Sequence, residues 1–221
     1  MDLSQLEKNF ESVRLKGDLA ETVERAIEFA DGCQQVRKYD AAIACLNKIL
    51  SVAREDKSQQ AVVLTALGTA YWEKAQLQKA LNHFEEALPL FKEKNDMEGK
   101  AAILSIVGIT FWRKCEWDKA LEILKDALSQ KGEPDNRFVS LYGALDRGIA
   151  TLQNRIKLGR ELQAPLKILQ PLFSASALYL ITGNLEELKS CLEESVTLAK
   201  QLGKTDILEA AEGISRLASP I

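Results

Sequence analysis

Apolar residues recur at steps of three and four along most of this chain, which is the spacing of an amphipathic helix. From Leu64 to Leu88 the apolar stripe keeps this spacing, but its phase jumps near Ala75. The same pattern returns 40 residues later, with a second phase jump near Cys115. Each of these two stretches therefore predicts a helix, a tight turn and a second helix.

The two stretches share residues as well as spacing. Residues 68–88 read GTAYWEKAQLQKALNHFEEAL, and residues 108–128 read GITFWRKCEWDKALEILKDAL. A glycine inside a helix costs about 1 kcal/mol relative to alanine. Its recurrence at Gly68 and Gly108 therefore predicts a close approach of two antiparallel helices, not a break in either one.

Weaker copies of the pattern lie on both sides. One starts at Val23 and has alanine at the position that aligns with Gly68 and Gly108. Another starts at Leu172 and has Gly183 in its turn. Residues 136–163 keep a helical phase, with Leu158 as the last apolar position, but fit the columns poorly. They predict either one long helix or a decayed repeat. Amphipathic stretches at the two ends are expected to cover the apolar faces that an open repeat would expose to water.

The expected organisation is one helical-repeat domain over residues 1–221. Its parts are an N-terminal capping helix (1–19), three repeats (20–57, 58–96 and 97–131), a divergent helix or decayed repeat (132–164), a further repeat (165–203) and a C-terminal capping helix (204–221).

The columns carry a family resemblance. A small residue followed three positions later by an aromatic, and then Ala, an aromatic or leucine, and Ala in the next helix, resembles the tetratricopeptide repeat. The period is stretched here to about 38 to 40 residues, compared with about 34 in the family. The resemblance implies an all-α fold, a right-handed superhelical solenoid of antiparallel helix pairs. It also implies a concave wall, built from the first helix of each pair, along which peptides or partner helices lie.

Projecting that wall onto this sequence gives a mixed surface with two tryptophans at its centre. Trp72 and Trp112 each follow the aromatic residue of the core stripe by one step around the helix. This position fits an aromatic anchor for a partner, and it equally fits a ring packed in the core. The wall lacks the lysine and asparagine that bind chaperone C-termini in the family. The expected partner-binding residues are Val62, Thr65, Thr69, Trp72, Glu73, Ser105, Ile106, Ile109, Trp112 and Arg113.

Charge adds a second candidate surface. The chain holds 32 acidic and 29 basic residues, a formal charge of -3, so its overall charge does not favour nucleic acid or an anionic membrane. Between residues 137 and 167, however, six basic residues stand against two acidic ones. An acidic partner segment is expected to dock there, on Arg137, Arg147, Arg155 and Arg160. No stacking aromatics are interleaved with these charges, which disfavours nucleic acid.

The sequence offers little for catalysis or for binding a cofactor. It contains no phosphate-binding loop, dinucleotide fingerprint or nucleophile elbow, and His83 is its one histidine. The four cysteines form no C-x-x-C pair and are expected to be reduced and mostly packed, while His83 is expected to pack half-buried. We expect no enzyme activity, no metal and no cofactor.

The start of the chain lacks both a basic segment and an apolar segment of a secretory leader, and no later apolar run approaches the roughly 18 residues that span a bilayer. A cytoplasmic protein without membrane insertion is expected. Its predicted function is that of a non-catalytic protein–protein interaction scaffold or adaptor, with a protein or peptide partner on the concave face. The alternatives are a ligand- or peptide-sensing regulatory protein, and a self-assembling scaffold that forms homo-oligomers through its end helices.

Overall fold

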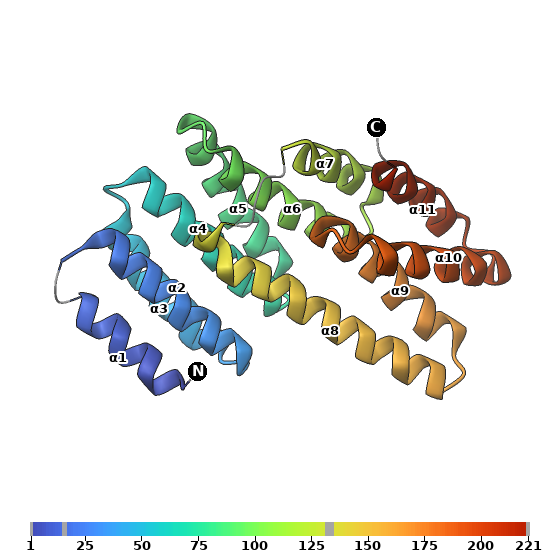
Figure 1. The fold of residues 1–221 in the computed structure, drawn as a ribbon, viewed down its shortest axis with the longest axis horizontal. Coiled ribbons are helices and arrows are strands. Elements are labelled where there is room, and N and C mark those ends of the chain that lie inside the picture. The colour runs from blue at the N-terminus through green and yellow to red at the C-terminus, as the bar shows by residue number, and fades with distance from the viewer. Residues whose placement is uncertain (1, 15–16, 131–134, 220–221) are drawn as a thin grey trace. The chain divides into compact units, whose positions relative to one another are not determined.

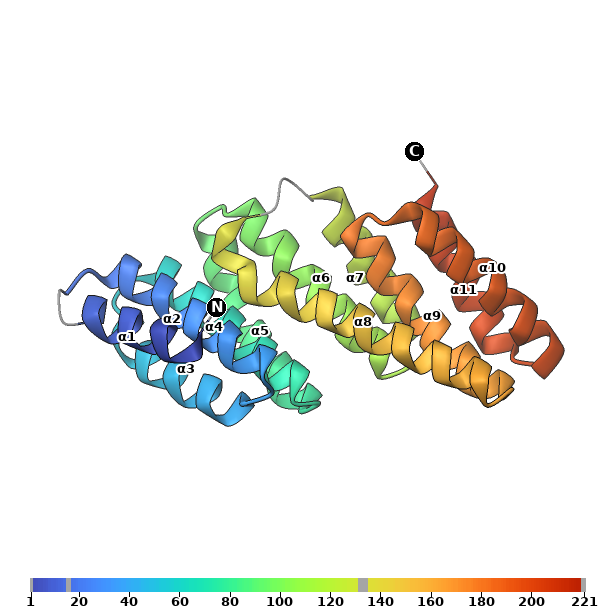
Figure 2. The same cartoon turned by 60° about the horizontal axis from the view of Figure 1, so that its bottom comes forward.

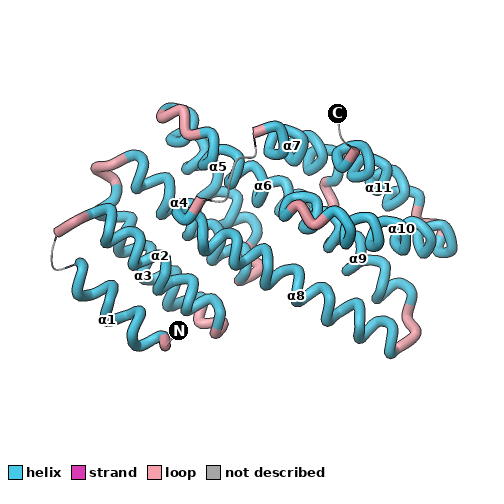
Figure 3. Tube along the Cα trace, in the orientation of Figure 1, coloured by secondary structure: helices cyan, strands magenta, loops and turns pink. Residues whose placement is uncertain are grey.

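The computed structural model describes residues 2–14, 17–130 and 135–219, and the regular elements in these ranges are helices (Figure 3). The predicted all-α fold is confirmed. The helices are α1 (Leu3–Arg14), α2 (Leu19–Gln35), α3 (Tyr39–Ala53), α4 (Lys57–Glu73), α5 (Leu77–Glu93), α6 (Met97–Arg113), α7 (Trp117–Ser129), the short 3-10 helix η1 (Asn136–Phe138), α8 (Val139–Glu161), α9 (Pro165–Thr182), α10 (Leu185–Leu202) and α11 (Thr205–Ala218).

The chain forms two compact units, and each is discontinuous in sequence. The first unit comprises Met1–Ile106 and Gln130–Ala144, and the second comprises Val107–Ser129 and Leu145–Ile221. Helices α6 and α8 therefore contribute residues to both units.

In the first unit, α2 pairs with α3 and α4 pairs with α5, while α1 packs on α2 (Figure 1). The recurring glycine explains how close one of these pairs is. A Cβ atom on Gly68 of α4 would lie 2.3 Å from the ring of Phe84 on α5, and Phe84 is fully buried. The predicted close approach of the two helices at Gly68 is confirmed.

The turns between paired helices explain the jumps in apolar phase. Ala75 and Cys115 both adopt a left-handed backbone conformation, with φ of 61°. After the first of these residues, the N–H of Gln76 donates to the carbonyl oxygen of Tyr71 at 2.9 Å, which closes the end of α4. One left-handed residue thus reverses the chain and restarts the stripe in a new phase.

In the second unit, α9 and α10 form a pair joined through Gly183, which has a φ of 82°. Helix α11 packs on α7, α9 and α10, and it lies beside α10 in Figure 2. Its Gly213 has no room for a side chain, because a Cβ atom there would lie 2.3 Å from Leu121 of α7. Ile207 and Ile214 of α11 are buried, so this amphipathic helix covers apolar side chains of the second unit.

The segment that fitted the repeat columns poorly is η1 followed by the single long helix α8, which is the first of the two predicted alternatives. The side chain of Asp135 caps the start of η1 by accepting a hydrogen bond from the N–H of Arg137. None of the helices in the described ranges is both long enough and apolar enough to cross a membrane.

Candidate functional site

The predicted wall residues on α4 lie in the interior of the protein. Val62, Thr65, Thr69 and Trp72 are buried, and Glu73 is half-buried. The two threonine hydroxyls already donate to backbone carbonyls of their own helix, with Thr65 bonded to Ala61 at 2.8 Å and Thr69 bonded to Thr65 at 2.9 Å. The two threonines therefore offer a partner neither accessible surface nor a free donor as the chain is folded.

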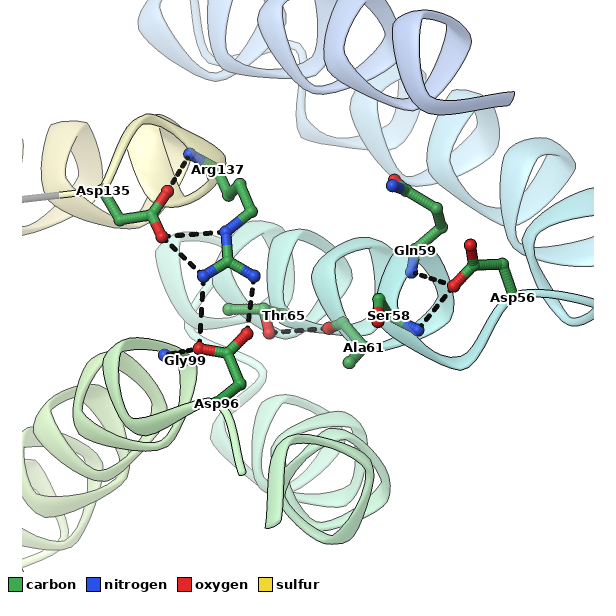
Figure 4. Close-up of polar contacts among 9 residues, drawn as sticks. All are labelled: Asp56, Ser58, Gln59, Ala61, Thr65, Asp96, Gly99, Asp135 and Arg137. Atoms are coloured by element: carbon green, nitrogen blue, oxygen red, sulfur yellow. Dashed lines mark hydrogen bonds and ion pairs between the residues drawn. The ribbon is translucent and has the colours of Figure 1, made fainter. Parts of the chain in front are cut away.

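The first unit covers part of this wall with its own chain, because η1 contacts α4. Arg137 of η1 forms two hydrogen bonds with the Asp96 carboxylate, at 2.5 and 3.2 Å, and two more with Asp135 (Figure 4). The ring of Phe138 packs edge-on against Phe91, with 5.7 Å between the ring centroids. A segment distant in sequence therefore lies on α4, one of the helices that the resemblance assigns to the concave wall.

The start of helix α8 contacts α2 in the same unit. The hydroxyl of Ser140 donates to the side-chain oxygen of Gln34 on α2 at 2.8 Å, and both residues are buried. The amide nitrogen of Gln34 has no hydrogen-bond partner among the described residues. The start of α8 therefore leaves one buried donor on α2 unsatisfied.

The predicted wall residues on α6 are also mostly buried. Ile106 and Ile109 lie in the interior, while Ser105 is half-buried and donates to the carbonyl of Ala101 at 2.8 Å. Trp112 belongs to an aromatic cluster in the second unit. Its Nε1–H donates to the Phe173 carbonyl at 3.2 Å, and the centroids of these two rings lie 4.7 Å apart. Seven of the ten predicted residues are thus interior, and only Arg113 is fully at the surface.

The four predicted arginines are divided between the two units. Arg137 belongs to the first unit and is bound by two carboxylates, whereas the other three belong to the second unit. Arg160 pairs with Glu194 of α10 at 2.5 Å, and Arg147 is half-buried. Arg155 is exposed and makes no ion pair within the described part of the chain. It is the predicted arginine with the most freedom to meet a partner.

Two exposed leucines line the same groove as Arg155, and a third lies in the turn between the two helices. Leu158 on α8, Leu162 in the turn after it and Leu166 at the start of α9 are 54%, 53% and 51% exposed. Residues 155, 158 and 162 follow one helix face, because they are spaced by three and four. We call the surface formed by Arg155, Leu158, Leu162, Leu166 and Lys167 the leucine–arginine surface.

Backbone geometry brings the two helices of this surface together. A Cβ atom on Gly159 would lie 2.9 Å from the carbonyl oxygen of Lys167, so only glycine allows α8 and α9 to cross this closely. The turn closes with Gln163 in a left-handed conformation (φ 48°) and with a hydrogen bond of 3.0 Å from the Ala164 N–H to the Gly159 carbonyl. Between the helices lies a groove of about 400 Å³, lined by Arg155, Leu158, Gly159, Leu166, Lys167, Gln170 and Pro171.

The electrostatics of this region are positive. Arg113 keeps more than a third of its surface exposed, yet desolvation of its guanidinium and the nearby charge of Arg155 lower its pKa. Helix α9 has no acidic residue in its first turn and no side-chain cap at Ala164, so the partial positive charge of its N-terminus is not offset locally.

The sequence held a signal for this surface that the repeat columns concealed. Leu158 stands two positions after Ile156, a step that turns it to the opposite side of the helix. Ile156 is buried and Leu158 is exposed, as that step requires. Leu162 lies near the end of the predicted segment 132–164 and Leu166 near the start of the predicted repeat 165–203, so the join between two elements separated them.

His83 and two of the four cysteines are poorly placed for chemistry. His83 is half-buried and stacks on Tyr71, with 5.3 Å between the ring centroids, and desolvation lowers its pKa. Burial raises the pKa of Cys45 to about 12 and that of Cys191 to about 11, so these thiols stay protonated and weakly nucleophilic. Among the described residues, no three or more His, Cys, Asp and Glu side chains are grouped to hold a metal ion.

Comparison with known proteins supports the repeat assignment. The tetratricopeptide repeat model matches residues 22–93. The crystal structure of BtubC (BKLC) from P. vanneervenii is similar in fold, with a TM-score of 0.55 and 18% identity over 91% of each chain. The TPR-like repeats of a Podosopora anserina protein described as a kinesin light chain align with a TM-score of 0.45 and 16% identity, over 80% of this chain and 94% of that one.

No curated protein matches the chain. Tetratricopeptide repeats build extended surfaces that bind other proteins. Residues 22–93 match the tetratricopeptide repeat, and the helix pairs and the recurring glycines agree with a helical-repeat fold of that type.

Proposed function

We propose that this chain is a non-catalytic adaptor that binds a segment of another protein, and that the segment binds at the leucine–arginine surface. One observation carries the proposal: Leu158 and Leu166 line one groove, Leu162 lies in the turn that joins their helices, and each keeps about half of its surface in water. Contiguous apolar exposure of this kind is typical of interaction sites in soluble proteins. The groove beside the leucines provides a place for apolar side chains of the partner.

The repeat type supports the adaptor part of the proposal. Stacked helix pairs are used mainly to present surfaces to other proteins. The one histidine stacks on an aromatic ring, and burial raises the pKa of two thiols, so the chemistry of these groups favours binding over catalysis.

A second site, on α2 and α4, requires displacement of η1 from α4 and of the start of α8 from α2. A partner would have to break the pair between Arg137 and Asp96 and the hydrogen bond between Ser140 and Gln34. The observation in its favour is the buried Gln34 amide, whose nitrogen lacks an acceptor among the described residues. Since an unsatisfied buried donor costs about 1–3 kcal/mol, a backbone carbonyl of a partner could gain by binding there.

Site-specific photo-crosslinking in the source cell tests the proposal. A photoreactive phenylalanine analogue placed at Leu162 is expected to capture a specific protein. The same analogue at Leu185, which is 56% exposed on α10 and lies outside the surface, serves as the matched control. Absence of an adduct at Leu162, or identical adducts at both positions, would refute the proposed site. An adduct between two copies of this chain would indicate a self-assembling scaffold and would refute the proposed adaptor function.

A double substitution Leu158→Gln/Leu166→Gln tests the same surface without a label. Both leucines are exposed, so the free energy of unfolding is expected to change by no more than about 0.5 kcal/mol per substitution. The captured protein should be lost with this variant and retained with Leu185→Gln. Retention with both variants would show that the leucines do not form the site.

A further inference from the structure

We infer that the segment bound at the leucine–arginine surface is acidic and amphipathic, with apolar side chains that enter the groove between α8 and α9 and carboxylates that pair with Arg155 and Lys167. This inference rests on the proposed function and adds the chemical class of the partner.

The apolar half of the inference comes from the shape of the groove. Gly159 contributes no side chain to it, while Leu158, Leu166 and Pro171 supply apolar walls. Leu158 and Leu166 are each more than half exposed, so the groove opens to solvent along the leucines. An open apolar groove fits a row of side chains on a continuous segment better than it fits a small molecule, which binds where most of its surface becomes buried.

The acidic half comes from the charges beside the groove. Arg155 and Lys167 line the groove and make no ion pair within the described ranges. Arg155 also acts as a like charge on Arg113. The nearby carboxylate of Glu194 is already bound to Arg160. Residues 155–167 hold four basic residues and one acidic residue, Glu161. A carboxylate from a partner would therefore meet net positive charge here, and a guanidinium such as that of Arg155 can bind it with two parallel hydrogen bonds.

The apolar and the basic residues of the surface are adjacent, and this determines the sequence pattern expected of the partner. Leu158 is one turn from Arg155 on α8, and Leu166 precedes Lys167 on α9. A bound helix would therefore carry apolar residues at steps of three and four, with Asp or Glu at the flanking positions. An anionic bilayer offers similar charges but no row of side chains to fill the groove.

Selection from a displayed library of random 16-residue peptides tests the inference on the full chain. Peptides are selected on the wild-type protein and then tested on Arg155→Glu/Lys167→Glu. The control is Lys189→Glu/Lys200→Glu, which makes the same charge change at exposed positions on α10. We expect the selected peptides to be net negative with apolar residues at helical spacing, and to bind the first variant at least about 10-fold more weakly, as measured by fluorescence anisotropy. The control variant should change their affinity by less than about twofold.

The leucines give a second readout. Leu158→Gln/Leu166→Gln is expected to weaken the same peptides by about 10-fold or more, since burial of each leucine contributes strongly to binding. A different result is that the peptides lose affinity for the leucine variant yet bind Arg155→Glu/Lys167→Glu as well as they bind wild type. That result would overturn the inference that the partner is acidic, and it would leave the proposed function standing.

If no selected peptide depends on either pair of residues, both the inference and the proposed site fail. Vesicles of phosphatidylserine and phosphatidylcholine provide a further arm, read by co-sedimentation. Binding to these vesicles that requires the same residues, in the absence of peptide binding, would show a membrane-binding surface and overturn the inference.

Discussion

Replacement of Trp112 by alanine tests whether its ring stabilises the second unit. The ring is 3% exposed, packs against Phe173 with 4.7 Å between the ring centroids, and lies 6.4 Å from the ring of Trp117. Its Nε1–H donates to the Phe173 carbonyl at 3.2 Å. A side chain with these contacts is part of the packed interior, although its place in the sequence also suited a binding anchor.

The magnitude follows from these contacts. Truncation of a buried aromatic side chain to alanine costs about 3–5 kcal/mol, because transfer free energy is lost and a cavity remains. The lost hydrogen bond adds about 1 kcal/mol. A domain of ordinary stability has only about 5–15 kcal/mol in total, so Trp112→Ala should remove a large part of the free energy of unfolding. Trp112→Phe keeps much of the ring packing but removes the donor, and should cost about 1–2 kcal/mol.

Urea unfolding followed by far-ultraviolet circular dichroism measures both variants without relying on tryptophan fluorescence. Because the chain has two units, the loss is expected in the transition to which the second unit contributes. Trp117→Ala is the comparison, since that ring is half-buried and its removal should cost less. A loss below about 1 kcal/mol for Trp112→Ala, with an unchanged denaturant slope, would refute the assignment of the ring to the core.

Three further predictions concern the first unit. Gly68→Ala should destabilise the chain by about 1–3 kcal/mol despite the better helix propensity of alanine, because its Cβ would overlap the Phe84 ring; differential scanning calorimetry should show a lower melting temperature. Burial raises the pKa of Asp96, but hydrogen bonds from Arg137 and the backbone lower it overall. The stabilisation by this carboxylate is therefore complete above the unfolded pKa of about 4 and is lost as the pH falls through the folded value, so Asp96→Asn should flatten the acid side of a urea-midpoint profile against pH. Ala75→Gly should stabilise by up to about 1 kcal/mol in urea unfolding, since glycine adopts the left-handed conformation without strain; a loss of stability would contradict this.

Local patterns predicted the helices and their turns well. The phase jumps near Ala75 and Cys115 became turns with a left-handed residue, and the glycine at position 68 marked a close approach to the next helix. These features are set by neighbouring residues in the sequence, so steps of three and four carry enough information to find them.

The burial of the predicted wall was harder to predict because it depends on contacts between distant residues. Phe173 lies 61 residues after Trp112, and Arg137 lies 41 residues after Asp96. The local spacing is the same for an aromatic residue that lines an open groove and for an aromatic residue that a later helix covers. The cover of α4 by η1 depends on where a distant segment folds, and that information was absent from the repeat columns.

The interleaved composition of the two units has a consequence for synthesis on the ribosome. The first unit needs Gln130–Ala144, so it cannot be completed when residue 106 emerges, and the following residues Val107–Ser129 belong to the other unit. During that interval Gln34 lacks its bond to Ser140, and the face of α4 that η1 later contacts is uncovered. The nascent chain therefore exposes a surface that the finished protein hides, and a truncation that ends before residue 130 would fix the protein in that unfinished state.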